Sequence, residues 1–197
     1  MNHPLQCRCG TVKGHVVRPG MANRALCYCR DCQAFARFLE RTDVLDENRG
    51  SAIVATLPHQ VHFSQGLDAL ACMSLSDRGM YRWYASCCNT PIGNTPRDAR
   101  MPYVGLIESC LASGSPSVEE SFGPVRMVLN TQHAGGPVRS TPLRNLVTML
   151  GLMTSVIGAR LTGGHRRNPF FDTAAGLPVK RPRVLTGAER ERFTNAA

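Results

Sequence analysis

The sequence lacks the features that would place the protein in or across a membrane. The apolar stretch between Arg144 and Arg160 is shorter than the roughly 20 residues that a membrane-spanning helix needs. Residues 1–10 contain no apolar run typical of a secretory signal, and they are not rich in arginine and serine like a transit peptide. We therefore expect a cytoplasmic protein without a membrane span.

Internal repeats and low-complexity tracts are also missing, so repeat and fibrous architectures are not expected. The 197 residues, 43% hydrophobic and 19% charged, are typical of one globular core with an appended segment. The sequence predicts a zinc-binding core over 1–111, a linker with one extra strand over 112–140, and a helix with a basic tail over 141–197.

Acidic residues are few, with 14 Asp and Glu against 23 Lys and Arg, which gives a net charge of +9. Such a field favours phosphate, anionic lipid or a small acidic ligand. Much of the excess lies late in the chain, in Arg160, Arg166, Arg167, Lys180, Arg181, Arg183, Arg190 and Arg192. We interpret this segment as a tail with a solvated basic face, and we do not expect specific nucleic-acid recognition.

Short apolar or alternating runs broken by Gly, Pro, Asn and Asp extend from Leu5 to about Ile107. They predict a mainly β fold of short antiparallel strands. Strands are expected around Val61, over 71–76, where buried and exposed residues should alternate, and over 81–85. A short helix is expected over 32–41.

Glycine and proline fill much of the segment 112–140, where one strand is expected over 125–129. Thr141 and Pro142 then predict the cap and first turn of a helix that ends near Leu161. Seven of its apolar residues have the spacing of a buried stripe: Leu143, Leu146, Val147, Leu150, Met153, Ile157 and Leu161. A second stripe, of small residues that include Gly151 and Gly158, favours close packing, either within the chain or in a homodimer through this helix.

Nine cysteines, seven of them in tight clusters, are the most informative feature. In a reducing compartment such clusters indicate metal binding or thiol chemistry rather than disulfides. Cys27, Cys29 and Cys32 place three thiols within six residues, close enough to hold one zinc ion. The fourth position would be filled by water or substrate, as in catalytic sites, or by another protein ligand, as in structural sites.

Cys7 and Cys9 form a second pair, followed by Gly10, which permits a tight backbone path. Their partners must come from elsewhere, and Cys87 and Cys88 are the remaining clustered thiols. Cys88 is the expected ligand and Cys87 the secondary candidate, because two neighbouring residues fit one ion poorly. The isolated Cys72 and Cys110 are expected to be small buried apolar residues.

The histidines have no paired metal-binding spacing, so they are expected to be surface or capping residues. His15 and His62 are the two that merit a check.

In order along the chain, CRCGTV, CYCRDCQAF and YRWYASCCNTPIGN resemble the motifs of the glutathione-dependent formaldehyde-activating enzyme family. Those motifs run CxCG, CHCxxC and an aromatic strand ending FCxxCGSPL. The resemblance covers Leu5 to Asn94, about half the chain, and indicates a divergent member. It implies a β-tent fold with two zinc sites. Its structural zinc would correspond to Cys7, Cys9 and Cys88, and its catalytic zinc to Cys27, Cys29 and Cys32.

Three positions depart from the family pattern. Ala85 stands where the late CxxC begins, so the structural site loses a ligand unless Cys87 replaces it. Asn89 replaces the glycine that follows that motif, and Tyr28 replaces the histidine of CHCxxC.

The resemblance implies carbon–sulfur lyase or adduct-forming chemistry, with glutathione as the thiol carrier of a small aldehyde. A zinc ion held by three thiolates would act as a Lewis acid, and basic side chains such as Arg30 and Arg37 would hold substrate carboxylates. Two alternatives remain. One is a non-catalytic, zinc-stabilised binding module, and the other is a thiol redox or metal sensor that releases its ion on oxidation.

Overall fold

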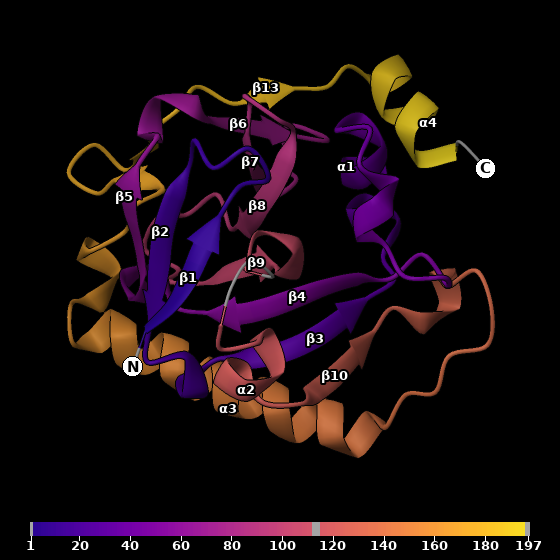
Figure 1. Cartoon of the computed structure of the whole chain (residues 1–197), viewed down its shortest axis with the longest axis horizontal. Helices are drawn as coiled ribbons and strands as arrows, with labels where there is room; N and C mark the ends of the chain where they lie inside the picture. Colours follow the sequence, from indigo (N-terminus) through magenta and orange to yellow (C-terminus); the bar gives the residue numbers. More distant parts are fainter. Residues whose placement is uncertain (1, 112–114, 196–197) are drawn as a thin grey trace.

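The structure is a computed structural model that describes residues 2–111 and 115–195. It is a mixed α/β arrangement with antiparallel-rich sheets and C-terminal helices (Figure 1). A small sheet has the strand order β1 (Asn2–Gln6), β2 (Lys13–Val17) and β5 (Val61–Gln65).

A large eight-stranded sheet carries most of the core. Its order is β10 (Val125–Leu129), β3 (Asn23–Cys27), β4 (Ser51–Thr56), β9 (Val104–Ile107), β8 (Thr90–Thr95), β7 (Tyr81–Ala85), β6 (Leu70–Ser74) and β13 (Arg183–Val184). The inner pairs are antiparallel, while β10 and β13 add to the two edges in parallel. A third sheet joins only β11 (Phe171–Asp172) and β12 (Leu177–Pro178).

The strands predicted over 81–85 and 125–129 are confirmed as β7 and β10. The strand predicted over 71–76 lies at 70–74, and the expected alternation of burial is wrong. Cys72, Met73 and Ser74 of β6 are all buried, because β6 is an inner strand covered on both faces.

Four α-helices complete the fold: α1 (Arg30–Phe38), α2 (Val118–Phe122), α3 (Pro142–Leu161) and α4 (Gly187–Asn195). Short 3-10 turns lie at Pro19–Met21, Thr42–Val44, Pro58–Gln60, Leu67–Ala69, Glu108–Cys110, Thr131–His133 and Gly164–Arg166. The helix predicted over 32–41 is α1, which begins two residues earlier. The expected boundary between 111 and 112 adjoins 112–114, outside the described residues.

The core centres on Trp83 of β7, whose side chain is fully buried. Its ring lies 5.2 Å from that of Phe170 and 6.3 Å from that of Phe171, and its Nε1 donates to Thr95 Oγ1 over 3.0 Å. The chain after α3 therefore returns to the main core rather than leaving it.

The basic C-terminal segment is not a free tail, although its basic face is solvated as the sequence predicted. The amide of Leu185, itself buried, donates to the carbonyl of Ser74 over 3.0 Å next to the β13–β6 pairing. Further on, the Phe193 ring of α4 lies 5.6 Å from Phe38 of α1. Apolar side chains between the arginines anchor the segment, and those arginines are largely exposed.

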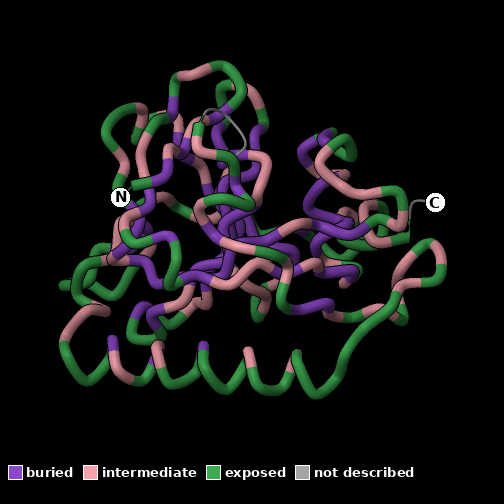
Figure 2. The backbone as a smooth tube through the Cα atoms, turned by 60° about the horizontal axis from the view of Figure 1, so that its bottom comes forward, coloured by how far each residue is buried: buried purple, intermediate pink, exposed green. Residues whose placement is uncertain are grey.

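Helix α3 has the predicted extent, but the prediction of its buried face is wrong. It packs through Leu152, Val156 and Ala159, while all seven residues of the predicted stripe are exposed. Figure 2 shows the helix along one edge of the molecule, with most of its residues exposed. A Cβ atom at Gly151 or Gly158 would meet no atom within 4 Å, so the small residues do not provide close packing within the described chain. Thr141 occupies the cap position, yet its side chain makes no capping hydrogen bond.

Within 2–111 and 115–195, no helix combines the length and the apolar character that crossing a membrane would require.

Candidate metal centres

The first cysteine cluster forms where β3 passes into α1. Cys27 ends β3, Cys29 is the N-cap residue of α1, and Cys32 lies in its first turn. The Cys29 sulfur accepts a hydrogen bond from the Cys32 amide over 3.3 Å, as an N-cap side chain does. The strand end and the helix start therefore bring three thiols together from a six-residue segment.

The three sulfur atoms lie within 4.8 Å of one another. Cys29 Sγ and Cys32 Sγ are 3.1 Å apart. Cys27 and Cys32 are buried, and Cys29 is half-buried. Among the described residues, no histidine, aspartate, glutamate or further cysteine joins this group. The group could thus offer three sulfur donors to a metal ion, one fewer than the four that zinc takes.

Two polar side chains from distant elements approach these sulfurs. Asn130, which follows β10, donates from Nδ2 to Cys27 Sγ over 3.4 Å. Arg82 of β7 is 4% exposed, and its Nη1 lies 4.0 Å from Cys32 Sγ and 3.1 Å from Asn94 Oδ1. Its Nη2 lies 3.7 Å from Asp31 Oδ2. A positive charge and an amide donor therefore face the thiol cluster, which favours thiolate forms.

Hydrogen bonds among the three thiols shift their pKa values in opposite directions. Hydrogen bonds from the Cys29 and Cys32 thiols lower the pKa of Cys27 to about 3, despite its burial. The pKa values of Cys29 and Cys32 are raised, above all by their contacts with Cys27. A first negative charge on the cluster is thus favoured, and a bound cation would favour further ionisation.

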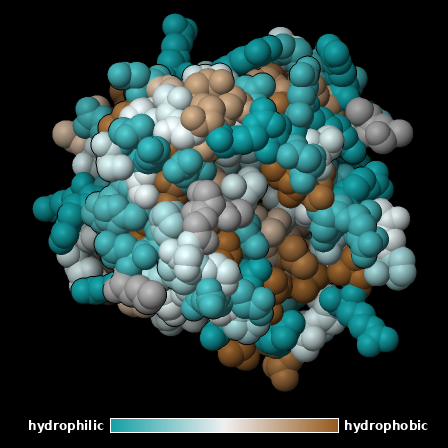
Figure 3. Space-filling view, viewed as in Figure 1, coloured by the Kyte–Doolittle hydropathy of each residue, from teal (hydrophilic) through white to brown (hydrophobic). Residues whose placement is uncertain are grey.

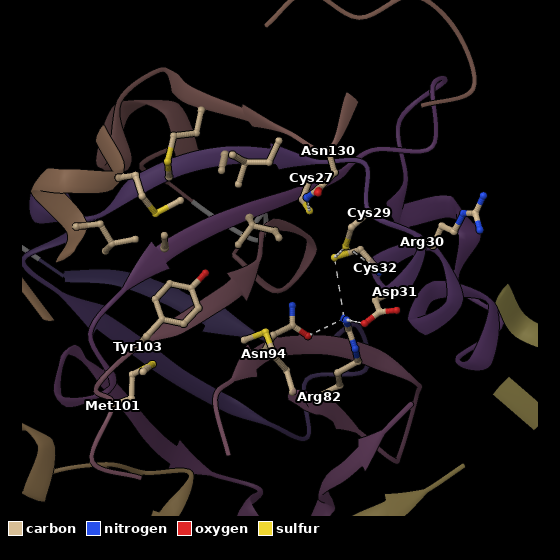
Figure 4. A pocket seen from close by; sticks show the side chains of 18 of the residues that line it. Cys27, Cys29, Arg30, Asp31, Cys32, Arg82, Asn94, Met101, Tyr103 and Asn130 are labelled. Atoms are coloured by element: carbon tan, nitrogen blue, oxygen red, sulfur yellow. Dashed lines mark hydrogen bonds and ion pairs between the residues drawn. The ribbon is translucent and has the colours of Figure 1, made fainter. Parts of the chain in front are cut away.

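A cavity of about 560 Å³ opens beside these cysteines. Figure 4 shows the cysteine sulfurs at one end, near Arg82 and Asn94, with Tyr103 and Met101 toward the other end. Methionines line much of the apolar wall: Met80, Met101, Met127, Met149 and Met153. Burial, and then the charges of Cys32 and Cys27, raise the pKa of Tyr103, so its hydroxyl remains a donor. The volume suits a small organic molecule.

The second cluster joins the β1–β2 turn to the β7–β8 turn. It contains Cys7, Cys9, Cys87 and Cys88, with sulfur atoms within 4.8 Å of one another. Cys87 Sγ lies 3.3 Å from Cys9 Sγ, 3.9 Å from Cys7 Sγ and 3.8 Å from Cys88 Sγ. Cys87 is therefore a candidate ligand together with Cys88, and the group has four cysteines although position 85 is alanine.

Both clusters fit zinc by their donor chemistry. Zinc favours thiolates, and tetrahedral Zn–S bonds of about 2.3 Å place neighbouring sulfurs roughly 3.8 Å apart. The hydrogen-bonded sulfur pairs lie 3.1–3.9 Å apart, and all sulfurs within each cluster lie within 4.8 Å of one another, so moderate adjustments would let each group surround an ion. The four-cysteine group could form a closed site, whereas the three-cysteine group could form an open one.

Other predicted positions lie apart from these centres. Cys72 and Cys110 are buried, and burial raises the pKa of each thiol, as expected for apolar residues. The rings of His15 and His62 stack at 5.1 Å on β2 and β5, and among the described residues neither joins a cysteine cluster.

The two arginines singled out in the sequence have different surroundings. Arg30 lines the cysteine cavity and also an adjoining polar hollow of about 390 Å³. Arg37 lines that hollow together with Arg49, but it does not line the cysteine cavity.

Sequence analysis missed Arg82, Asn94, Tyr103 and Asn130. A charged residue inside the aromatic strand segment YRWYA was a usable signal for Arg82, because a buried arginine needs partners. Asn94, Tyr103 and Asn130 carry no comparable sequence signal, since only the strand pairing brings them to the cavity.

The comparisons with known proteins describe a family and a distant structural likeness. The model of a family of unknown function, DUF6151, matches residues 1–180. A crystal structure of a Rhodobacter sphaeroides protein, a structural genomics target, is 17% identical, with 64% of this chain and 99% of that chain covered and a TM-score of 0.43. No curated protein matches the chain.

Proposed function

The chain belongs to the DUF6151 family of unknown function, and we propose that it is a zinc-binding carbon–sulfur lyase that acts on thiol adducts of small aldehydes. Its motifs support this proposal through their similarity to the glutathione-dependent formaldehyde-activating enzyme family, with which a β-tent fold and a cytoplasmic protein would be consistent. The single observation that carries it is the three-cysteine group at the end of a cavity.

That group would hold zinc through Cys27, Cys29 and Cys32, all three of which line the cavity. Zinc in such a site supplies Lewis acidity to a bound oxygen or sulfur. Arg82, buried and 4.0 Å from Cys32 Sγ, would stabilise the thiolates and attract an electron-rich substrate head. Asn130 would keep Cys27 oriented through its hydrogen bond.

The cysteine cavity and the adjoining polar hollow would bind different parts of the substrate. The methionine-lined cavity would take the carbon chain of the aldehyde, and the Tyr103 hydroxyl would donate a hydrogen bond to an adduct oxygen. Arg30 borders the polar hollow that Arg37 and Arg49 also line, so this hollow would hold the carboxylates of a thiol carrier such as glutathione.

Breakdown and formation of thiol–aldehyde adducts test the proposal directly. Zinc-loaded protein should accelerate conversion of glutathione–formaldehyde and related adducts, and Cys27→Ser should abolish that acceleration. Cys72→Ala is the matched control, because Cys72 is buried outside both clusters. Absence of turnover by the zinc-loaded parent across a panel of such adducts contradicts the lyase assignment.

The four-cysteine group would hold a structural zinc. It joins two turns that are about 80 residues apart in sequence, and it lies near the surface, with Cys9 and Cys87 exposed. Closed sites of this kind contribute to folding and have no vacant position for substrate.

One observation favours the sensor alternative. Cys9 and Cys87 are both exposed, and their sulfurs are 3.3 Å apart. Peroxide would take two electrons from the two zinc-bound thiolates and two protons from solvent, which yields one disulfide and two waters, and the zinc ion would leave. Zinc release by peroxide that a thiol reductant reverses, in a protein without lyase activity, would support this function instead. A stable zinc content without either activity would support the binding module.

A further inference from the structure

The outward face of α3 is a continuous apolar stripe, formed by the seven exposed residues that sequence analysis expected to be buried. Their exposed fractions range from 44% at Met153 to 82% at Leu161. At 3.6 residues per turn they occupy an arc of about 120°. In Figure 3, hydrophobic side chains reach the lower edge of the molecule, where α3 runs in Figure 1. Proteins rarely leave a stripe of this size in contact with water alone.

All charged residues of the segment that carries this stripe are basic. From Ser121 to Phe171 the sequence has six arginines and no lysine, aspartate or glutamate. Two of them, Arg144 and Arg160, are exposed on α3, and the helical period places them on opposite borders of the stripe. Asp98 interacts electrostatically with Arg160. Its carboxylate is already paired with another arginine, because Asp98 Oδ1 lies 3.0 Å from Arg100 Nε.

This combination distinguishes between two possible occupants of the stripe. In a symmetric dimer, the arginines of one copy would lie against the same arginines of the other. The segment has no aspartate or glutamate to separate them, so repulsion between like charges opposes that contact. An anionic lipid surface instead offers an apolar layer to the stripe and negative headgroups to its borders. With 20 residues, α3 has a length typical of helices that lie in the plane of a membrane.

We propose that α3 docks the protein onto an anionic membrane surface, with the stripe inserted and with Arg144 and Arg160 at the level of the lipid phosphates. The cavity beside the cysteines adjoins the same helix. Met153 belongs to the stripe and also lines the cavity, together with Met149, Leu152 and Val156. Docking would therefore bring the apolar wall of the cavity next to the lipid layer, where apolar compounds are concentrated.

Co-sedimentation of the full chain with vesicles tests this proposal. Vesicles of phosphatidylcholine with added phosphatidylglycerol should bind the protein, whereas vesicles of phosphatidylcholine alone should bind it more weakly. Binding should also weaken as salt screens the arginines. If the parent protein does not bind the anionic vesicles at low salt, the proposal is wrong.

Variants then identify the docking surface. Leu146→Gln combined with Leu150→Gln should weaken vesicle binding at least about tenfold, because two side chains lose their burial in lipid. Glutamine keeps a high helix propensity, and neither leucine lines the cysteine cavity. Arg144→Gln should weaken binding about fivefold. The matched control is Leu177→Gln, because Leu177 is 62% exposed but lies outside α3, and it should bind like the parent.

Sedimentation without lipid tests the rival occupant. The parent should be a monomer, and so should the double variant. A parent dimer that the double variant dissociates would assign the stripe to a second copy and overturn the membrane proposal. Vesicle binding that the double variant retains in full would overturn it as well.

Discussion

The guanidinium of Arg82 lies 4.0 Å from the sulfur of Cys32, although 50 residues separate the two in sequence. Arg82 is an inner residue of β7, and Cys32 lies in the first turn of α1. This contact connects the thiol cluster with an inner strand of the large sheet.

Replacement of Arg82 by methionine removes the buried positive charge and keeps a similar length. We expect zinc affinity at the three-cysteine group to fall about 10-fold to 100-fold, as for other residues that orient metal ligands. Competition with a chelator measures the change. Arg97→Met is the control, because Arg97 lies over the Tyr81 ring and contacts no clustered cysteine. Equal losses in both variants would contradict a specific role for Arg82.

Cys9→Ser should remove the structural zinc that we assign to the four-cysteine group. The zinc content should fall by one ion per chain, and the free energy of unfolding by more than about 2 kcal/mol, because the β1–β2 and β7–β8 turns lose their link. That loss corresponds to a decrease in Tm of at least about 4 °C. Thermal unfolding followed by circular dichroism measures it, and an unchanged Tm would count against a metal at this position.

Gly151→Ala should stabilise the protein. Gly151 is exposed in the middle of α3, and a Cβ atom there would meet nothing within 4 Å. Alanine has a higher helix propensity, so the free energy of unfolding should rise by about 0.5–1 kcal/mol. Denaturant unfolding measures this gain, and a loss of stability would show that this face of α3 packs closely against another surface.

His59 should make the protein less stable in mild acid. Burial, then the charges of Arg167 and Arg18, lower its pKa from the ordinary value of 6.5. The unfolded chain therefore binds a proton more readily, and the free energy of unfolding should decrease as the pH falls below about 6.5. His59→Gln should flatten this dependence in denaturant titrations between pH 5 and 7. An identical pH dependence in the variant would exclude His59 as its source.

The sequence predicted local features well and long-range arrangements poorly. The close spacing of Cys27, Cys29 and Cys32 was enough to predict that their thiols lie together. A strand end and a helix cap within six residues allow few other backbone conformations. The extent of α3 could also be predicted from Pro142 and Gly163. Its buried face could not, since apolar residues occur almost all round this helix and its widest stripe is not the one that contacts the sheet.

Other features depend on pairings between distant segments. The parallel addition of β10 and β13 to the sheet edges places Asn130 at the first cluster and folds the basic segment back onto β6. No periodicity within either segment indicates its partner. Tyr103 likewise reaches the cavity through the pairing that begins at Val104.

The zinc content of purified protein tests the central claim most directly. Protein produced in zinc-replete medium should carry two zinc ions per chain, one at each cysteine group, and Cys27→Ser should carry one while it remains folded. Protein without bound metal, in which Cys27, Cys29 and Cys32 all react freely with an alkylating reagent, would contradict the account.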